Sequence, residues 1–297
     1  MAVLTLITPT FNRATTLIRC WESLRRQTSK QFQWLVIDDG STDNTATIMG
    51  QLKQQTTDFI IDYYHKPNGG KHTALNFSHP YIEGDFVLIL DSDDFLSDDA
   101  VEIVLQEWSK VLRHQEIGGI TFMCGTIGGD SLAKMPCDSV LSNHIEFRIN
   151  QKIQGDCCET LRSPVFKNFL FPEISGENFL GEGMLWTTIA LTYQTLYLAR
   201  IIYIVPEYRS DGLTKSGRKM RLRNLRGALL NNELHMNHKI IFRVRIKNAL
   251  LKTCYSFFLK KNVIQMLKET QHKALVTAVS PFGYLLYQYW HRKYSGE

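Results

Sequence analysis

Three carboxylates stand at the end of a short apolar segment. Residues 86–90 are all apolar and favour a buried strand, and Asp91, Ser92, Asp93 and Asp94 follow directly. Ligands of open α/β sheets bind just outside the carboxyl ends of strands. Carboxylates this close repel one another unless a cation joins them, and hard oxygen ligands suit Mg²⁺ or Mn²⁺ shared with substrate phosphates. The run predicts a metal and diphosphate site; the alternative is an acidic turn capping the next helix.

Strand and helix patterns alternate through the first half of the chain. Strands are expected at 3–8, 34–37, 60–64 and 86–90, and helices at 14–27, 43–52, 71–78 and 98–112. The next part is less regular, with strands expected at 120–124, 156–161 and 197–205 and helices at 164–169 and 183–194. This alternation predicts an α/β fold, a mostly parallel sheet with helices on both faces.

Basic residues gather at the C-terminal end. The net charge is +5, but residues 218–297 hold 16 Lys and Arg against 3 Glu, which is +13, so residues 1–217 carry −8. Helices are expected over 222–239 and 240–260, a break at 280–283, and then an aromatic run, 284–290, beside cations. This composition is typical of a helical appendage on an anionic membrane surface. The alternative is a helical subdomain folded onto the catalytic body.

Other features narrow the class of protein. The six cysteines are scattered without paired spacing, which predicts reduced thiols rather than a zinc site or disulfides. The first apolar segment meets Pro9 too early for a signal peptide, and no run of 18 apolar residues predicts a spanning helix. We therefore expect a cytoplasmic protein, peripheral on the inner face of the cell membrane. No nucleic-acid-binding motif accompanies the basic tail.

Four motifs follow the first four expected strands in order. They are Thr-Pro-Thr-Phe-Asn-Arg at 8–13, Val-Ile-Asp-Asp-Gly-Ser-Thr-Asp at 36–43, Asn-Gly-Gly-Lys at 68–71 and Asp-Ser-Asp-Asp at 91–94. Each is common alone, but the ordered series resembles the family 2 glycosyltransferases of the GT-A fold. The resemblance covers roughly residues 2–217. It implies a glycosyltransferase domain, 1–217, with a nucleotide-sugar half (1–95) and an acceptor half (96–217), followed by the basic helical region 218–297.

The resemblance also implies a nucleotide site. Its residues would be Thr8, Pro9, Thr10, Asn12, Asp38, Asp39, Lys71 and Asp91. One of Asp38 and Asp39 would accept a hydrogen bond from uracil N3–H while the other holds the loop, although Asp-Gly-Ser is also ordinary turn chemistry. Lys71 follows a glycine turn at a helix start, where backbone N–H groups favour an anion.

The resemblance divides the acidic run by role. Asp93 would bind Mn²⁺ or Mg²⁺ directly, and Asp91 would lie near the ribose or the water shell of the metal. Asp94 would shape the loop or face the donor sugar. Arg209 or Lys215 could pair with the diphosphate, and a solvated basic linker is the alternative for that segment.

The catalytic base is expected at the start of the helix near residue 183. Relatives often carry Glu-Asp there, but this chain has Glu182 followed by Gly183. Glu182 is the candidate base, and Glu177, in the preceding loop, is the second candidate. The structural alternative for Glu182 is a glutamate that complements the dipole of the helix N-terminus.

These expectations define an inverting, non-processive transferase. It would move one sugar from a UDP-sugar to a hydroxyl of a lipid-linked or oligosaccharide acceptor, in the synthesis of capsule, lipopolysaccharide or a similar polysaccharide. Two alternatives stay open. A sugar nucleotidyltransferase would want a glycine-rich loop after the first strand, which 8–13 lacks. A nucleotide-sugar-binding protein without turnover is suggested by Gly183.

Overall fold

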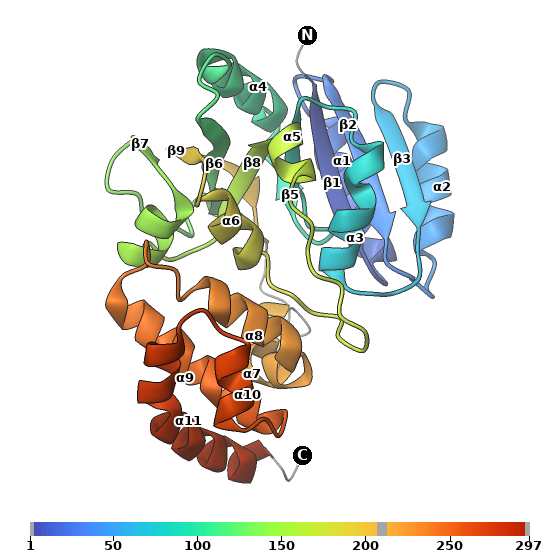
Figure 1. The fold of residues 1–297 in the computed structure, drawn as a ribbon. Coiled ribbons are helices and arrows are strands. Elements are labelled where there is room, and N and C mark those ends of the chain that lie inside the picture. Colours follow the sequence, from blue (N-terminus) through green and yellow to red (C-terminus); the bar gives the residue numbers. More distant parts are fainter. Residues whose placement is uncertain (1–2, 207–212, 295–297) are drawn as a thin grey trace.

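A computed structural model of the chain describes residues 3–206 and 213–294 (Figure 1). Within these residues nine strands form one sheet, in the order β3-β2-β1-β4-β8-β6-β9-β5, with β7 paired to β9. The strands are β1 (Leu4–Thr10), β2 (Phe32–Asp38), β3 (Ile60–His65), β4 (Phe86–Ile89), β5 (Phe95–Leu96), β6 (Ile117–Gly125), β7 (Ser139–Ser142), β8 (Cys157–Arg162) and β9 (Gln194–Ile204). Strands β3, β2, β1 and β4 are parallel, and β8 joins them antiparallel to β4.

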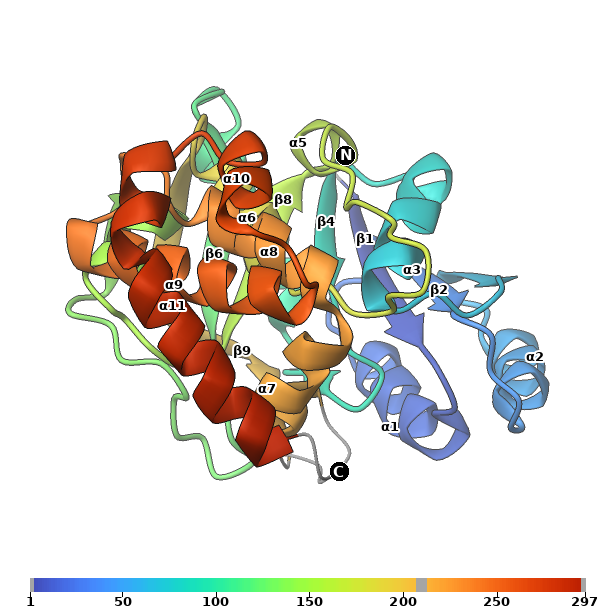
Figure 2. The same ribbon diagram turned by 60° about the horizontal axis from the view of Figure 1, so that its bottom comes forward.

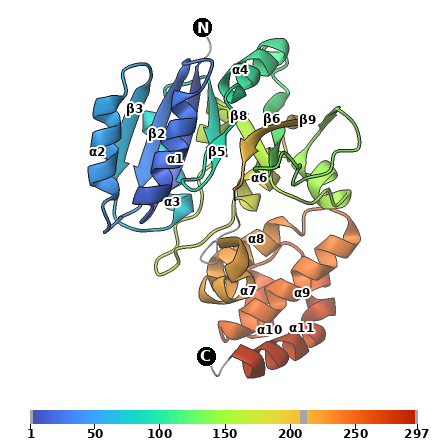
Figure 3. The same ribbon diagram turned by 180° about the vertical axis from the view of Figure 1, so that it is seen from behind.

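Helices cover both faces of the sheet, as predicted (Figures 1 and 3). They are α1 (Ala14–Arg25), α2 (Thr45–Gln55), α3 (Lys71–Ser78), η1 (His79–Tyr81), α4 (Ala100–Val111), η2 (Ile145–Asn150), α5 (Ser163–Lys167) and α6 (Gly183–Ile189). Side chains of α1, α2 and α4 pack into one apolar core, and those of α3, α5 and α6 pack into a second on the opposite face. In the first core Trp108 stacks on Phe86 and donates its indole N–H to Thr160, 3.0 Å away.

Strand β1 continues through Pro9, where the sequence suggested an end at Thr8. Pro9 pairs in register with Ile37 of β2, but β4 pairs with β1 only as far as Ile7. Ile7 accepts from Leu90 on the β4 side, and Pro9, two residues further, faces the same side beyond the end of β4. The missing N–H of Pro9 therefore leaves no ladder bond unmade. This extension carries Thr10 to the edge where β2 also ends.

The expected helix 183–194 was too long. Helix α6 ends at Ile189, and β9 starts at Gln194, where it pairs with Ile117 of β6. Tyr193 lies against Gly118, which has no side chain to obstruct it. Pairing with a fully buried strand outweighs local helical periodicity here. The sequence patterns also missed the short strand β7 and the π-helical turn η2.

The basic C-terminal region is a helical bundle, which lies below the sheet in Figure 1 and in front of it in Figure 2. Its helices are α7 (Leu213–Arg223), α8 (Leu225–Leu234), α9 (Phe242–Phe258), α10 (Val263–Lys268) and α11 (Lys273–Tyr294). These helices enclose apolar clusters of their own, one around Met236 and Met266 and one around Tyr255 and Trp290. Helix α8 packs against α6, which joins the bundle to the catalytic sheet.

The expected break at 280–283 was wrong, because α11 runs through it without interruption. Pro281 and Thr277 both lie on the exposed side of α11. Pro281 has no N–H to donate to the Thr277 carbonyl, which can bond to water instead. Gly283 lies on the opposite side against α9, where a Cβ would come 2.7 Å from the Cβ of Thr253. The segment whose sequence predicts a turn is thus part of a continuous helix. Its glycine allows close contact with α9, and its proline lies on the outer side of α11.

The aromatic run at the C-terminus also differs from the prediction. Trp290 is buried, packs near Tyr255 and lies under the guanidinium of Arg218. Tyr287 is half-buried against Phe258, whereas Tyr289 is exposed. Trp290 therefore holds the bundle together and does not face outward as an interfacial side chain.

We predict that Trp108→Ala lowers the free energy of unfolding by about 3–5 kcal/mol, because it removes the largest side chain between α4 and the sheet. Leu112→Ala, at an exposed position of the next turn, should change it by less than about 0.5 kcal/mol. Urea denaturation of both variants measures the difference. Equal effects would contradict the assignment of Trp108 to the core.

Candidate active site

Two distant carboxylates meet at one lysine. Lys71 is the first residue of α3, and its ammonium pairs with Asp91, just after β4, and with Glu182, which precedes α6, at 2.5 Å. Burial disfavours the charge on Lys71, but the two carboxylates outweigh burial and raise its pKa above the ordinary value. The structure therefore brings together the predicted nucleotide side and the predicted acceptor side of the site.

Asp39 holds the glycine turn that starts α3. Its carboxylate accepts from the backbone N–H groups of Gly69 at 2.9 Å and Gly70 at 2.6 Å, and it pairs with Lys66 at 2.5 Å. Gly70 has a φ of +93°, and a Cβ there would lie 1.9 Å from the carbonyl oxygen of Asn178. Only glycine fits this contact. Asp39 thereby fixes the turn on which Lys71 and the acceptor-side loop both depend.

The other predicted nucleotide residues lie at the adjoining ends of β1 and β2. Thr10 pairs in register with Asp38, whose carboxylate accepts from Tyr63 at 2.6 Å and from the Ser41 N–H at 2.8 Å. The Thr10 hydroxyl is buried and has no hydrogen-bond partner among the described residues. Because buried hydroxyls usually have a hydrogen-bond partner, the Thr10 hydroxyl is a candidate contact for a ligand at these strand ends.

Thr8 and Asn12 have internal partners. The Thr8 hydroxyl accepts from the indole of Trp34 at 2.9 Å, and Thr8 is fully buried. Asn12, with a φ of +54°, accepts through its side chain from the Thr42 N–H at 2.8 Å. Asn12 therefore ties the loop after β1 to the loop after β2. Pro9 lies between Thr8 and Thr10 in β1.

The acidic run is pinned by a tyrosine from β9. The Tyr203 hydroxyl accepts from the Asp91 N–H at 3.0 Å and donates to the Asp94 carboxylate at 2.9 Å. Burial, followed by the charge of Asp91, raises the pKa of Asp94 to about 7. From the other side, Arg19 of α1 donates to the Asp93 carbonyl at 2.5 Å. The Asp93 carboxylate makes no side-chain hydrogen bond within the described ranges.

These acids suit a divalent cation only together with a ligand. In residues 3–206 and 213–294, no three Asp, Glu, His or Cys side chains converge as a metal site. Mg²⁺ and Mn²⁺ are commonly held by one or two carboxylates with substrate phosphates completing the shell. Asp91 and Asp93 supply two such carboxylates in one turn. The donor set therefore fits a metal that arrives with a diphosphate.

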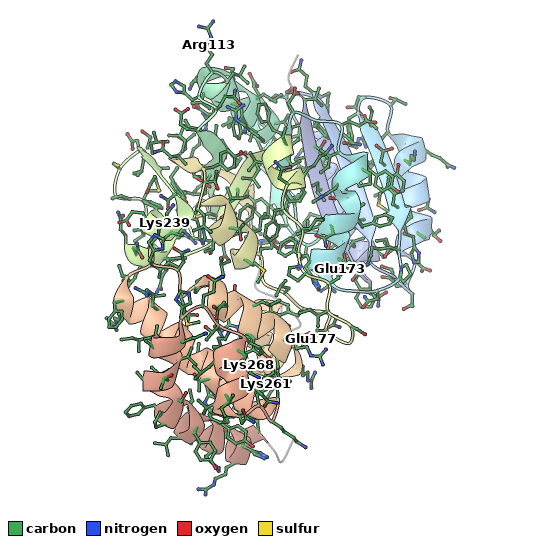
Figure 4. All side chains as sticks on the ribbon, viewed as in Figure 1. Arg113, Glu173, Glu177, Lys239, Lys261 and Lys268 are labelled. Carbon is green, nitrogen blue, oxygen red and sulfur yellow. The ribbon has the colours of Figure 1, made fainter. Side chains whose placement is uncertain are left out.

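The two candidate bases have different surroundings. Glu182 is the N-cap residue of α6, half-exposed and paired with Lys71. Both carboxylate oxygens of Glu177 accept backbone N–H groups at the start of α8, from Arg226 and from Gly227, each at 2.8 Å. Figure 4 shows Glu177 beside the bundle and Glu173, in the same loop, nearer α3. Glu177 caps a helix, whereas Glu182 faces the site.

A further carboxyl lies beneath α6. Glu159 of β8 lines a small cavity together with Thr121, His144 and Tyr197. Burial raises the pKa of Glu159 to about 8; the charge of Arg148 opposes this rise and that of Glu182 adds to it. Neither Glu159 nor Tyr203 belongs to a sequence motif. Only the structure reveals them as candidate site residues, because strand pairing sets their positions. The sequence did contain a signal for Lys66, which is a cation directly before the turn at Pro67 and Asn68.

The residues predicted to bind the diphosphate lie in a segment that the structure describes only in part. Arg209 lies outside the described residues, and so does the side chain of Lys215 in α7. Arg218, another cation of this segment, is described. It donates to the Tyr294 hydroxyl at 3.3 Å and covers Trp290, so it links α7 to the end of α11.

The sequence model of the family described as Glycosyl transferase family 2 matches residues 5–164, and the chain belongs to this family. A GalNAc(5)-diNAcBac-PP-undecaprenol beta-1,3-glucosyltransferase of Campylobacter jejuni is 27% identical over 270 residues, 87% of this chain and 81% of that protein. Chondroitin synthase of Pasteurella multocida is 37% identical over 102 residues, but these cover only 34% of this chain and 10% of that protein.

Solved structures show the same fold. TarS of S. aureus in complex with UDP-GlcNAc has a TM-score of 0.62 and 16% identity, covering 86% of this chain and 72% of that one. The mannosyltransferase PcManGT of Pyrobaculum calidifontis, in complex with GDP-Man and Mn²⁺, has a TM-score of 0.59 and 15% identity, covering 100% and 88%. The protein is a glycosyltransferase of the GT-A fold.

We predict that Glu177→Gln lowers the free energy of unfolding by about 1 kcal/mol, because the variant loses a charged cap on α8. Its rate of sugar transfer should stay within about threefold of wild type at a temperature where both are folded. Thermal unfolding and transfer assays measure the two effects. A loss of transfer by orders of magnitude without a loss of stability would instead identify Glu177 as the base.

Proposed function

We propose that this glycosyltransferase moves one sugar from a UDP-sugar to a hydroxyl of a lipid-linked glycan, with inversion at the anomeric carbon. The observation that carries the proposal is the double ion pair of Lys71 with Asp91 and Glu182. It sets a carboxylate of the acceptor half beside the acidic run expected to meet the donor diphosphate. An inverting transfer needs these groups on either side of one anomeric carbon.

The chemical step would be a single displacement. The Glu182 carboxylate takes the proton of the acceptor hydroxyl, whose oxygen forms a bond to the anomeric carbon. The bond from that carbon to the diphosphate oxygen breaks, and UDP leaves with the electron pair. Lys71 stays charged, so it holds Glu182 in place and offers a cation to the developing negative charge on the diphosphate.

The nucleotide would lie across the ends of β1 and β2. Thr10 and Asp38 would face the base, with Asp39 holding the glycine turn. Asp93 and Asp91 would hold Mn²⁺ or Mg²⁺, and such an ion neutralises charge on a departing diphosphate. Arg209 and Lys215, from the segment before and within α7, stay candidates for the same diphosphate.

A lipid-linked acceptor is supported by the relative from Campylobacter jejuni, whose name places an undecaprenol diphosphate on its acceptor. The +13 charge of residues 218–297 agrees with work at an anionic membrane surface. No described helix is long and apolar enough to cross a bilayer. We therefore propose a peripheral enzyme of cell-surface polysaccharide synthesis, such as a capsule or lipopolysaccharide, acting at the inner face of the membrane.

Glu182→Gln should reduce transfer by about two to four orders of magnitude while UDP affinity changes little, because a general base acts on the acceptor. Glu173→Gln, in the same loop and bonded to Asn76, is the matched control and should retain most activity. UDP release from UDP-sugars over a membrane fraction with native acceptors measures the transfer. Near-normal transfer by Glu182→Gln would move the base elsewhere.

UDP should bind at least about tenfold more weakly after removal of divalent cations, because Asp91 and Asp93 then face a diphosphate without a bridging charge. Asp93→Asn should abolish this metal dependence and leave the circular dichroism spectrum unchanged. Asp98→Asn, an exposed acid paired with Arg26, should keep it. Calorimetry with and without EDTA makes the comparison. Equal affinities for wild type in both buffers would refute the metal assignment.

A further inference from the structure

The outer side of α11 carries an apolar stripe that no other described element covers. Phe282, Leu285 and Tyr289 are 64%, 63% and 59% exposed, and Ala278 and Pro281 lie among them. On a helix of 3.6 residues per turn these five positions fall within a sector of about 100°. Figures 1 and 2 show α11 as the outermost layer of the bundle.

The opposite side of α11 accounts for the packing of the bundle. Val276, Val279, Gly283 and Trp290 are buried, chiefly against α9. The helix is therefore apolar on two sides, which is unusual for a helix at a protein surface. The exposed stripe needs a partner of its own, because it plays no part in holding the bundle together.

The charges around the stripe select the partner. Helix α11 contains no acidic residue, while Lys273 stands exposed at one end and Arg292 and Lys293 at the other. The two acids described between 218 and 294 are already engaged: Glu233 with Lys252 and Glu269 with Lys261. Arg292 and Lys293 lie within about 60° of Tyr289 around the helix, whereas Lys273 lies about 120–180° from Phe282, Leu285 and Tyr289. The face therefore presents apolar side chains bordered by two cations at its C-terminal end.

A second copy of the chain is a poor partner for this face. A parallel pair of α11 helices would place each cation against its own equivalent. Like charges set against each other in this way disfavour association. An anionic, partly apolar surface meets both requirements.

We infer that α11 lies along an anionic phospholipid bilayer, with Phe282, Leu285 and Tyr289 among the headgroups and Arg292 and Lys293 on lipid phosphates. This inference rests on the proposed function, since a lipid-linked acceptor requires the enzyme to work at a membrane. It names a face different from that suggested by the sequence, because Trp290 is turned into the bundle. The contact of Arg218 with Tyr294 links the end of α11 to α7 within the bundle, and α8 joins the bundle to α6.

The test compares full-length variants on vesicles. Wild type should sediment with vesicles of phosphatidylglycerol and phosphatidylcholine, and high salt should release only part of it, because apolar contacts are not screened. The triple variant Phe282→Ser, Leu285→Ser and Tyr289→Ser should bind these vesicles at least about tenfold more weakly, and its residual binding should be fully released by salt. Arg292→Gln with Lys293→Gln should weaken binding to the anionic vesicles at least about tenfold and leave binding to purely zwitterionic vesicles unchanged.

Ile127→Ser is the control, an exposed apolar position far from the bundle in sequence and 69% exposed; it should bind like wild type. UDP affinity should be unchanged in every variant, which separates this inference from the assignment of the donor site. Should the triple variant fail to fold, Phe282→Ser and Leu285→Ser alone provide the comparison, because neither removes a buried contact. Vesicle binding by the folded α11 variants equal to wild type, no binding by wild type, or a wild-type dimer that these variants convert to monomer would each overturn the inference.

Discussion

The ion pairs of Lys71 are the contact on which the arrangement of the site depends. A charged lysine in a mostly enclosed position is tolerated only where carboxylates surround it, and here these come from opposite halves of the catalytic sheet. The turn before Lys71 is fixed in turn by Asp39, and Gly70 allows the acceptor-side loop to touch that turn. Under the proposed mechanism, loss of any of these residues would separate the groups that act on one sugar.

Tyr203 plays a comparable part on the other side of the acidic run. Its hydroxyl bonds both the Asp91 backbone and the Asp94 carboxylate. One side chain near the end of β9 therefore holds the turn that follows β4. Burial and the charge of Asp91 raise the pKa of Asp94, and the hydrogen bond from Tyr203 opposes this rise. The turn is therefore rigid before any ligand arrives, and rigid placement of charged groups is a large part of what an enzyme contributes to a transfer reaction.

Much of this could be predicted from the sequence because motif and strand end coincide. Four motifs follow four strands, three of them acidic or glycine-containing, and parallel strands bring their ends to one edge. Prediction failed where long-range contacts decide. The glycine at 283 and the proline at 281 read as a turn, but close packing on α9 keeps the helix intact. The sequence ranked Glu177 second to Glu182 as the candidate base, but it could not reveal the two bonds that Glu177 makes to the start of α8.

The loop from α5 to α6 is fastened at both sides. Asn76 of α3 holds Glu173, and the first amides of α8 hold Glu177, five residues before Glu182. A shift of the bundle relative to the sheet would therefore pull on the short span between Glu177 and the start of α6. The C-terminal helices and the candidate base are thus joined by one short segment, so the position of Glu182 is set from outside the sheet as well as from within it.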